Sequence, residues 1–370
     1  MAEEDTVWSK APVLAAFGNP ILDMCVLLAD DQVLKKHHLL PDGQKEITES
    51  EKEAILRDVR GRYTIQYCAG GVAQNTLRVF QWLSGVALSS VFLGGIGTDE
   101  HGKMLENLVK KCGVITRYTY HEDYPTATCI ALIQGANRSL VAHLGAANVY
   151  EPHHLDAIGI RDVLSAVKMI YIEGFFITHS FSTALKLIHY CQSEGIALAF
   201  NLCGAYVCEK YPSQVLELLK HADIVFGNSS EFKKLNESLN WKCRTIHDIA
   251  VQAKDVGGSI DNIRRRKLDL ELLRNGKVVV VTQGKESVVL VHGKSMSACE
   301  VEVPSVEPSL IKDTTGAGDS FVAGFLAGMF SGEEISTCVK WGCWTAQQII
   351  QQIGCAIPNY SPVGLRNVHN

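Results

Sequence analysis

The eight residues Asp-Thr-Thr-Gly-Ala-Gly-Asp-Ser at 313–320 could bind an anion and place a base beside it. Gly316 and Gly318 carry no Cβ atoms, so the backbone N–H groups around them can face an approaching anion. The apolar run at 321–330 predicts a buried helix, whose first turn has unpaired N–H groups that favour an anion. Asp319 would repel a bound phosphate unless it serves as the base for a hydroxyl that attacks this phosphate. An ordinary turn is the alternative, with Thr315 as the helix N-cap and Asp319 complementing the helix dipole.

The elements that must position this loop follow from the hydrophobic pattern. Near-continuous apolar runs predict strands buried on both faces at 89–95, 169–176, 197–202, 223–228 and 277–284. Helical patterns alternate with them at 182–195, 214–222 and 263–276. This order predicts a three-layer α/β/α core with a mainly parallel sheet, which binds its ligands beyond the carboxyl ends of the strands.

Two polar, β-branched stretches interrupt this alternation. They predict a small β lid domain, formed by residues 22–67 and 117–143 and lying over the crevice of the large sheet. The large α/β domain, which would bind nucleotide and carry out catalysis, then consists of residues 1–21, 68–116 and 144–370.

The composition argues against several classes of protein. A net charge of −5 offers no basic surface for nucleic acid. The acidic N-terminus and the lack of an apolar run of about 18 residues predict neither a secretory signal nor a membrane span, and hence a cytoplasmic protein. The 12 cysteines show no C-x-x-C spacing and no neighbouring paired histidines, so we expect reduced thiols and no zinc site.

The loop and its helix also carry a family resemblance. The thirteen residues D-T-T-G-A-G-D-S-F-V-A-G-F resemble the C-terminal signature of the ribokinase-like kinases of sugars and nucleosides. Further segments resemble the adenosine kinase branch of this family in order and spacing, and the resemblance extends over essentially the whole chain. These segments are GNPILD (18–23), AGGVAQN (69–75), GGIGTDEHG (94–102), NRSL (137–140), GFF (174–176), FGNSSE (226–231) and TQG (282–284).

The resemblance implies a ribokinase-like fold and an activity. The expected reaction is phosphorylation of the 5′-hydroxyl of adenosine by ATP with Mg²⁺, giving AMP and ADP in purine salvage. A monomer is expected, in the cytoplasm and also the nucleus. Two alternatives stay open, namely a kinase of inosine, guanosine or ribose with the same fold, and a nucleoside-binding protein without catalysis.

The resemblance also implies roles for residues. Asp319 would be the base for the 5′-hydroxyl, acting mainly by positioning it in a loose phosphoryl-transfer transition state. The backbone amides of Gly316, Ala317 and Gly318 would stabilise the transferred phosphoryl group. Arg138, on the lid, would bind the phosphates when the lid closes.

The nucleoside would be bound by the N-terminal motifs and the lid. Asn19 and Asp23 would bind the vicinal ribose hydroxyls, so that a deoxyribose leaves buried polar groups unpaired. Phe176 would stack on the purine, although an aromatic residue at a strand end also fits a core position. Further contacts are expected from Gly70, Gly71, Asn75, Gln44 and Leu140, with Asn75 on the 3′-hydroxyl.

ATP and magnesium would lie at the ends of two later strands. Asn228 and Glu231 would order Mg²⁺-bound water around the phosphates, while a capping box of the following helix is the alternative for this pair. Thr282, Gly284 and Thr315 would line the ATP site. Three residues depart from the family pattern: Val72 where serine is common, and Lys45 and Glu46 where apolar residues would seal the sugar pocket.

Overall fold

The computed structural model describes residues 12–41, 43–135, 137–257, 273 and 276–362. The helix predicted at 263–276 therefore lies almost entirely outside the described residues. Within the described part of the chain, none of the helices combines the length and the apolar character that crossing a lipid bilayer requires.

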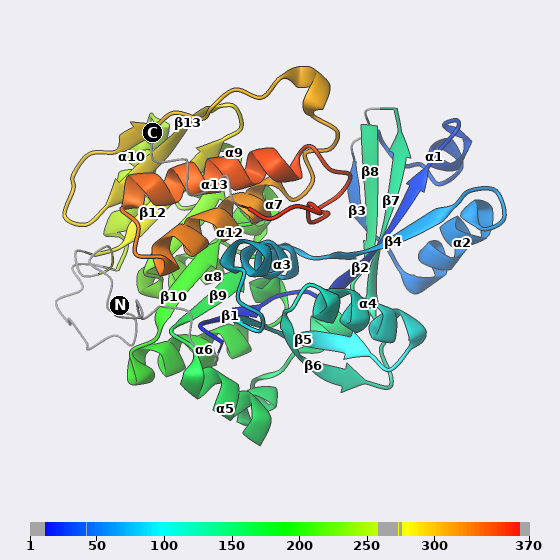
Figure 1. The fold of residues 1–370 in the computed structure, drawn as a ribbon, viewed down its shortest axis with the longest axis horizontal. Coiled ribbons are helices and arrows are strands. Elements are labelled where there is room, and N and C mark those ends of the chain that lie inside the picture. The colour runs from blue at the N-terminus through cyan, green and yellow to red at the C-terminus, as the bar shows by residue number, and fades with distance from the viewer. Residues whose placement is uncertain (1–11, 42, 136, 258–272, 274–275, 363–370) are drawn as a thin grey trace.

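A nine-stranded sheet forms the centre of the large domain (Figure 1). Its strands, in spatial order, are β14 (Cys299–Val301), β13 (Glu286–His292), β12 (Val278–Gln283), β11 (Ile224–Asn228), β10 (Ala197–Asn201), β9 (Met169–Glu173), β1 (Leu14–Phe17), β5 (Ser90–Gly97) and β6 (Ile115–His121). The strands from β12 to β6 are parallel, while β13 and β14 are antiparallel at one edge. All five strands predicted from apolar runs are present, and the prediction of a mainly parallel sheet is confirmed.

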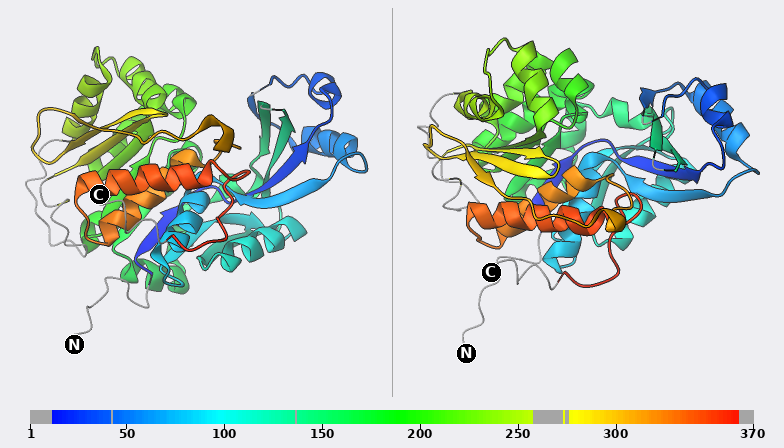
Figure 2. Two further views of the ribbon diagram at one scale, coloured as in Figure 1. Left: turned by 45° about the horizontal axis from the view of Figure 1, so that its top comes forward. Right: turned by 90° about the horizontal axis from the view of Figure 1, so that it is seen from above.

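Helices cover both faces of this sheet, as the two views in Figure 2 show. One apolar layer packs under α3 (Val72–Ser84), α4 (Glu100–Lys111), α12 (Ala317–Phe330) and α13 (Ile335–Ile349). The other packs under α5 (Ile158–Ala166), α6 (Phe181–Glu194), α7 (Ala205–Lys210), α8 (Pro212–His221), α9 (Ser229–Ser238) and α10 (Ile246–Asp255). Short 3₁₀ turns occur at η1 (Gly145–Val149), η2 (Pro152–Asp156), η3 (Phe176–Thr178) and η4 (Pro308–Leu310). The helices predicted at 182–195 and 214–222 correspond to α6 and α8, which confirms the three-layer core.

A second sheet forms the lid, beside the large domain in Figure 1. Its spatial order is β3 (Gln44–Glu46), β8 (Asn137–His143), β7 (Ala127–Gln134), β2 (Ile21–Leu27) and β4 (Ile65–Gly70). Its apolar face packs against α1 (Gln32–Lys36) and α2 (Glu49–Val59). The predicted start of the second lid segment at residue 117 is wrong, because β6 pairs with β5 in the large sheet up to His121.

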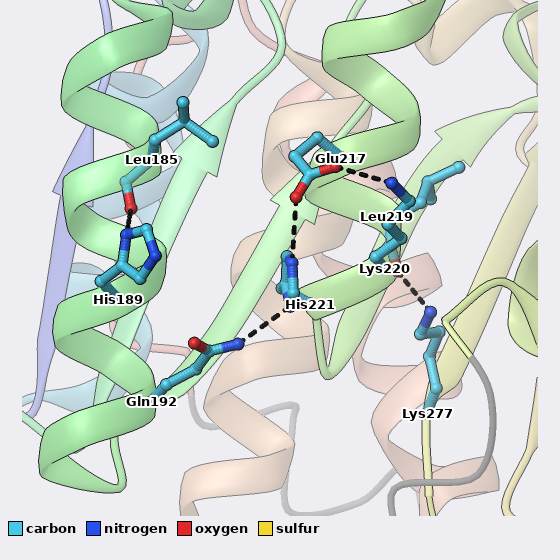
Figure 3. A network of polar contacts seen from close by, with 8 residues as sticks. All are labelled: Leu185, His189, Gln192, Glu217, Leu219, Lys220, His221 and Lys277. Atoms are coloured by element: carbon cyan, nitrogen blue, oxygen red, sulfur yellow. Dashed lines mark hydrogen bonds and ion pairs between the residues drawn. The ribbon is translucent and has the colours of Figure 1, made fainter.

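A buried lysine lies at the end of the large sheet where β12 begins (Figure 3). Lys277 is 6% exposed and donates hydrogen bonds to the carbonyls of Leu219 and Val256. Nearby, His221 connects Gln192 of α6 with Glu217 of α8. This network joins helices at the end of the sheet away from the carboxyl ends of the strands.

Candidate active site

A cavity of about 170 Å³ lies where β10, β11 and β12 end and α12 begins. Five of the predicted site residues line this cavity: Asn228, Glu231, Thr282, Gly318 and Asp319. The other lining residues are Val72, Asn201, Cys203, Phe226, Gly227, Phe321 and Val322. Its position agrees with the expectation that a parallel sheet binds its ligand beyond the carboxyl ends of its strands.

The start of α12 has the geometry of an anion site. Gly316 is the N-cap with a φ angle of 75°, and a Cβ there would lie 2.7 Å from the Cys355 side chain, so both conformation and space require glycine. An added Cβ at Gly318 would meet no atom within 4 Å. Within the described part of the chain, the N–H groups of Gly318 and Asp319 donate no hydrogen bond. These two groups can therefore bind an anion at the positive end of the helix dipole.

Two expectations about this loop change with the structure. The Ala317 N–H donates to the Thr314 carbonyl at 3.2 Å, so this amide already has a partner inside the loop. Thr315 is not the N-cap, because Gly316 occupies that position and the Thr315 N–H bonds the Asp313 carboxylate. The predicted burial of the helix is confirmed, since its residues from Ser320 to Phe330 are buried.

Asp319 faces the cavity from the first turn of α12. Its Oδ2 accepts a hydrogen bond from Asn75 Nδ2 at 3.0 Å. Burial raises the pKa of Asp319 to about 6, opposed by the Asn75 hydrogen bond and by the charge of Arg78, whereas Asp23 raises it further. A carboxyl group with this pKa is mostly ionised at neutral pH and is a stronger base than an exposed aspartate.

Two glycines at the end of β4 make room for the predicted ribose ligands. A Cβ at Gly70 would lie 2.4 Å from the carboxylate atoms of Asp23. A Cβ at Gly71, where φ is 88°, would lie 2.2 Å from the Asn19 carbonyl oxygen. The backbone at both glycines therefore lies close to the predicted ribose ligands, and a side chain at either position would displace them. Burial raises the pKa of Asp23 to about 6, while the charges of Arg138 and Arg78 oppose this shift.

Two residues that were not singled out from the sequence, a buried glutamate and a half-buried histidine, hold Asn19. Glu173, at the end of β9, accepts the Asn19 N–H at 2.8 Å through Oε1 and the Ala73 N–H at 2.6 Å through Oε2. Burial raises the pKa of Glu173 to about 8, against these two hydrogen bonds. His179 Nε2 lies 3.0 Å from Asn19 Oδ1, and burial lowers the pKa of His179 to about 4. A neutral His179 with its proton on Nε2 therefore donates to Asn19.

Arg138 connects the lid to the anion-binding loop. Its Nη1 lies 2.5 Å from Asp313 Oδ2, and both side chains are largely buried. Asp313 also accepts the N–H groups of Thr315 and Gly354, which fixes its carboxylate. Arg138, the predicted phosphate ligand, is thus held against Asp313 in the loop that leads to the N-cap Gly316.

The remaining predicted lid residues lie on neighbouring strands. Gln44 and Leu140 are register partners of β3 and β8, with the Gln44 side chain exposed. Lys45 pairs with Glu51 of α2 at 3.0 Å and is exposed, so it does not seal a pocket. Gly284, with φ 65°, has open space around it at the turn after β12.

The pair of Asn228 and Glu231 forms a capping box at the start of α9. The Asn228 side chain accepts the N–H groups of Ser230 and Glu231, while Glu231 accepts from the backbone and side-chain nitrogens of Asn228. Burial raises the pKa of Glu231 to about 7. Direct coordination of a metal by Asn228 would break this cap, whereas contact through water leaves it intact. Among the described residues, no group of three or more His, Cys, Asp or Glu side chains could hold a metal.

The prediction that Phe176 stacks on the purine conflicts with the structure. Phe176 is fully buried in the core, where its ring packs against Phe17 and Tyr150. Its neighbour Phe175 is only partly buried and stacks on Tyr206, with ring centroids 5.7 Å apart and planes 18° apart. Tyr206 is 46% exposed. Phe175 and Tyr206 therefore keep part of their stacked ring pair accessible, whereas the Phe176 ring is covered on all sides.

Comparison with known proteins decides the family. The family model described as pfkB family carbohydrate kinase matches residues 62–362. The chain belongs to this kinase family. It is 31% identical to the adenosine kinase of Saccharomyces cerevisiae, over 94% of this chain and 97% of the relative. It is 28% identical to adenosine kinase 2 of Arabidopsis thaliana, over 94% and 96% of the two chains.

Solved structures of similar proteins agree with this kinase in fold. The Anopheles gambiae adenosine kinase, in complex with P1,P4-di(adenosine-5) tetraphosphate, has a TM-score of 0.83 at 30% identity and covers 95% of this chain and 99% of its own. The Schistosoma mansoni adenosine kinase, in complex with 2-fluoroadenosine, has a TM-score of 0.84 at 25% identity, with 96% and 99% covered. The ribokinase-like fold expected from the sequence is confirmed.

The kinase brings together motifs that lie far apart in its sequence. Asn75 of the AGGVAQN segment contacts Asp319, and Asn228 and Glu231 line the same cavity as Asp319. Asn201 and Cys203 also line this cavity and were not predicted. Asn201 ends β10 and Cys203 follows two residues later, so the rule that ligands bind at the carboxyl ends of strands could have found them.

Proposed function

We propose that this kinase transfers the γ-phosphoryl group of ATP to the 5′-hydroxyl of adenosine, giving AMP and ADP. The observation that carries the proposal is Asp319. This ionisable carboxylate faces the cavity at a helix N-terminus with free N–H groups and bonds Asn75 of the glycine motif. The similarity to adenosine kinases over nearly the whole chain supports adenosine as the acceptor.

Asp319 acts as the base in this proposal. Its free oxygen Oδ1 accepts the hydrogen bond of the 5′-hydroxyl, orients it toward the γ-phosphorus, and takes the proton late in the transfer. The unpaired N–H groups of Gly318 and Asp319 stabilise the charge on the transferred phosphoryl group. Arg138 exchanges its bond to Asp313 for a bond to the phosphates when ATP and nucleoside are bound.

The ribose is held by Asp23 and Asn19. The Asp23 carboxylate can accept hydrogen bonds from vicinal hydroxyls, and the missing side chain at Gly70 leaves room for this carboxylate. A deoxyribose would leave this half-buried carboxylate without one of its hydrogen-bond donors, which costs affinity. Phe175 and Tyr206 would contact the purine, in place of the Phe176 contact expected from the sequence.

Mg²⁺ would accompany ATP and neutralise charge on its phosphates. Asn228 and Glu231 would hold it through water, which keeps their capping box intact and suits the tendency of magnesium to retain water. Thr282 and Gly284 would contact ATP, with Thr315 at the phosphates. A monomer in the cytoplasm and nucleus stays a prediction from the resemblance, and light scattering of the purified protein tests the monomer.

One substrate panel tests this function. The purified kinase is incubated with Mg²⁺ and ATP and with adenosine, 2′-deoxyadenosine, inosine, guanosine or ribose, and products are identified by mass. We expect AMP as the dominant product and much less product from 2′-deoxyadenosine. IMP, GMP or ribose phosphate as the dominant product would replace the substrate but keep the chemistry. Nucleoside binding without any product would contradict the kinase proposal.

A further inference from the structure

A buried arginine lies behind the proposed base and has no role in the mechanism above. Arg78, on the second turn of α3, is 7% exposed. Its Nη1 donates to the Ala69 carbonyl at 2.6 Å and to Asn75 Oδ1 at 3.0 Å, and its Nη2 donates to the Cys355 carbonyl at 3.0 Å. The guanidinium group therefore reaches the glycine strand, the residue that bonds Asp319, and the segment after α13.

The contact with Asn75 fixes the orientation of its amide group. Because Arg78 donates to Oδ1, the Asn75 Nδ2 group is left to donate to Asp319 Oδ2, at 3.0 Å. The flipped amide would place two donors against each other at Arg78 and two acceptors against each other at Asp319. Both neighbours therefore favour the same orientation. This orientation leaves Asp319 Oδ1 as the oxygen that can accept a substrate hydroxyl.

We propose that Arg78 is a positioning residue for phosphoryl transfer, which fixes Asn75 so that Asp319 is held as a charged, singly hydrogen-bonded base. The proposal rests on the proposed role of Asp319 as the base. It adds a residue three positions after Asn75, which bonds the amide oxygen of this asparagine while the amide nitrogen bonds Asp319.

The charges around Asp319 support this role. The positive charge of Arg78 lowers the pKa of Asp319, against burial and the negative charge of Asp23. Asp319 also interacts electrostatically with titratable groups on the surrounding elements. These are Asp23 of β2, Glu173 of β9, Glu231 of α9, Tyr171 of β9, Cys203 after β10 and Cys355 after α13. Arg78 is the positive group among those that shift the pKa of Asp319, so its removal should raise that pKa.

A purely structural role must be separated from this positioning role. Arg78 also holds the Ala69 carbonyl beside Gly70 and the Cys355 carbonyl beside Gly316, so its loss should destabilise the fold in either case. A structural role alone predicts a lower melting temperature without a change in the pH dependence of turnover. The pH profile of kcat is therefore the decisive measurement.

The experiment compares Arg78→Met, Arg78→Lys and the wild type. The turnover of the intact protein is measured from pH 5 to 8 with saturating adenosine and Mg-ATP. For Arg78→Met we expect the plateau of kcat to fall about tenfold and the acidic midpoint to rise by about half a pH unit or more. Arg78→Lys keeps the charge, so its midpoint should stay close to the wild-type value although its melting temperature falls.

A second buried cation provides the matched control. Lys277 also donates to two backbone carbonyls but lies at the opposite end of β12 from the cavity. Lys277→Met should lower the melting temperature and leave the midpoint unchanged.

A double variant tests whether Arg78 acts through Asn75. In the Asn75→Ala background, Arg78→Met should reduce the plateau kcat much less than in the wild type, because the residue through which Arg78 acts is gone.

The outcomes separate this inference from the proposed function. An unchanged midpoint in a folded Arg78→Met protein, or losses that add independently in the double variant, would overturn the positioning role while leaving Asp319 as the base. Near-normal turnover of Asp319→Asn would overturn both. If Arg78→Met does not fold, Arg78→Lys takes its place in the double variant with Asn75→Ala. A loss of plateau kcat that is much smaller in this background than in the wild type supports the positioning role, and losses that add independently overturn it.

Discussion

Gly70→Ala should damage nucleoside binding while leaving the fold intact. The new Cβ would lie 2.4 Å from the Cγ and both carboxylate oxygens of Asp23, whereas ordinary contacts begin near 3.4 Å. The φ angle of Gly70 lies outside the left-handed region, so alanine adds no backbone strain. The carboxylate must therefore retreat by about 1 Å, and a misplacement of this size can cost about 100-fold, or about 2.7 kcal/mol, in kcat/KM.

Steady-state kinetics with each substrate varied in turn provides the assay. We expect kcat/KM for adenosine to fall about 100-fold while the KM for ATP changes little. Gly159→Ala is the matched control, because Gly159 in α5 has open space around it and no positive φ angle. In an Asp23→Ala background, Gly70→Ala should have no further effect. A Gly70→Ala enzyme within threefold of the wild type would refute the inference that this glycine makes room for the Asp23 carboxylate.

Three further changes test other parts of the site. With a pKa of about 6 for Asp319, kcat should fall about tenfold from pH 7 to pH 5 as the base is protonated, and equal rates at both pH values would contradict this assignment. Gly318→Ala places a methyl group in the cavity without backbone strain. The KM for ATP should therefore rise about tenfold while the melting temperature stays unchanged. Unchanged kinetics would exclude an anion at this position. Phe175→Ala should raise the KM for adenosine about tenfold, whereas Phe176→Ala should cost about 3–5 kcal/mol of unfolding free energy. The reverse pattern in kinetics and chemical denaturation would restore Phe176 as the ligand contact.

Much of the core could be predicted because its signals are local. Valine-rich and isoleucine-rich runs mark the central strands, since a strand covered on both faces must be apolar along its whole length. The strand β6 was assigned to the lid because it lies at the sheet edge and alternates in burial, and a half-exposed strand has the same pattern in either sheet. The assignment of the purine contact to Phe176 failed because of the local backbone. The strand β9 ends at Glu173 and a 3₁₀ turn begins at Phe176, so the alternation of side chains no longer applies between them.

The sequence by itself determined the chemistry that this protein could perform: a glycine loop before a buried helix, an aspartate at its start, and a parallel sheet whose strand ends point to one crevice. Only the tertiary structure decided how those groups are held. The contacts of Arg78 with Asn75, of Glu173 with Asn19, and of Arg138 with Asp313 join residues 3, 154 and 175 positions apart. Residue type and local periodicity carry no information on which buried polar groups meet. Those partners are fixed by the packing of whole elements and by the need to pair each polar group removed from water.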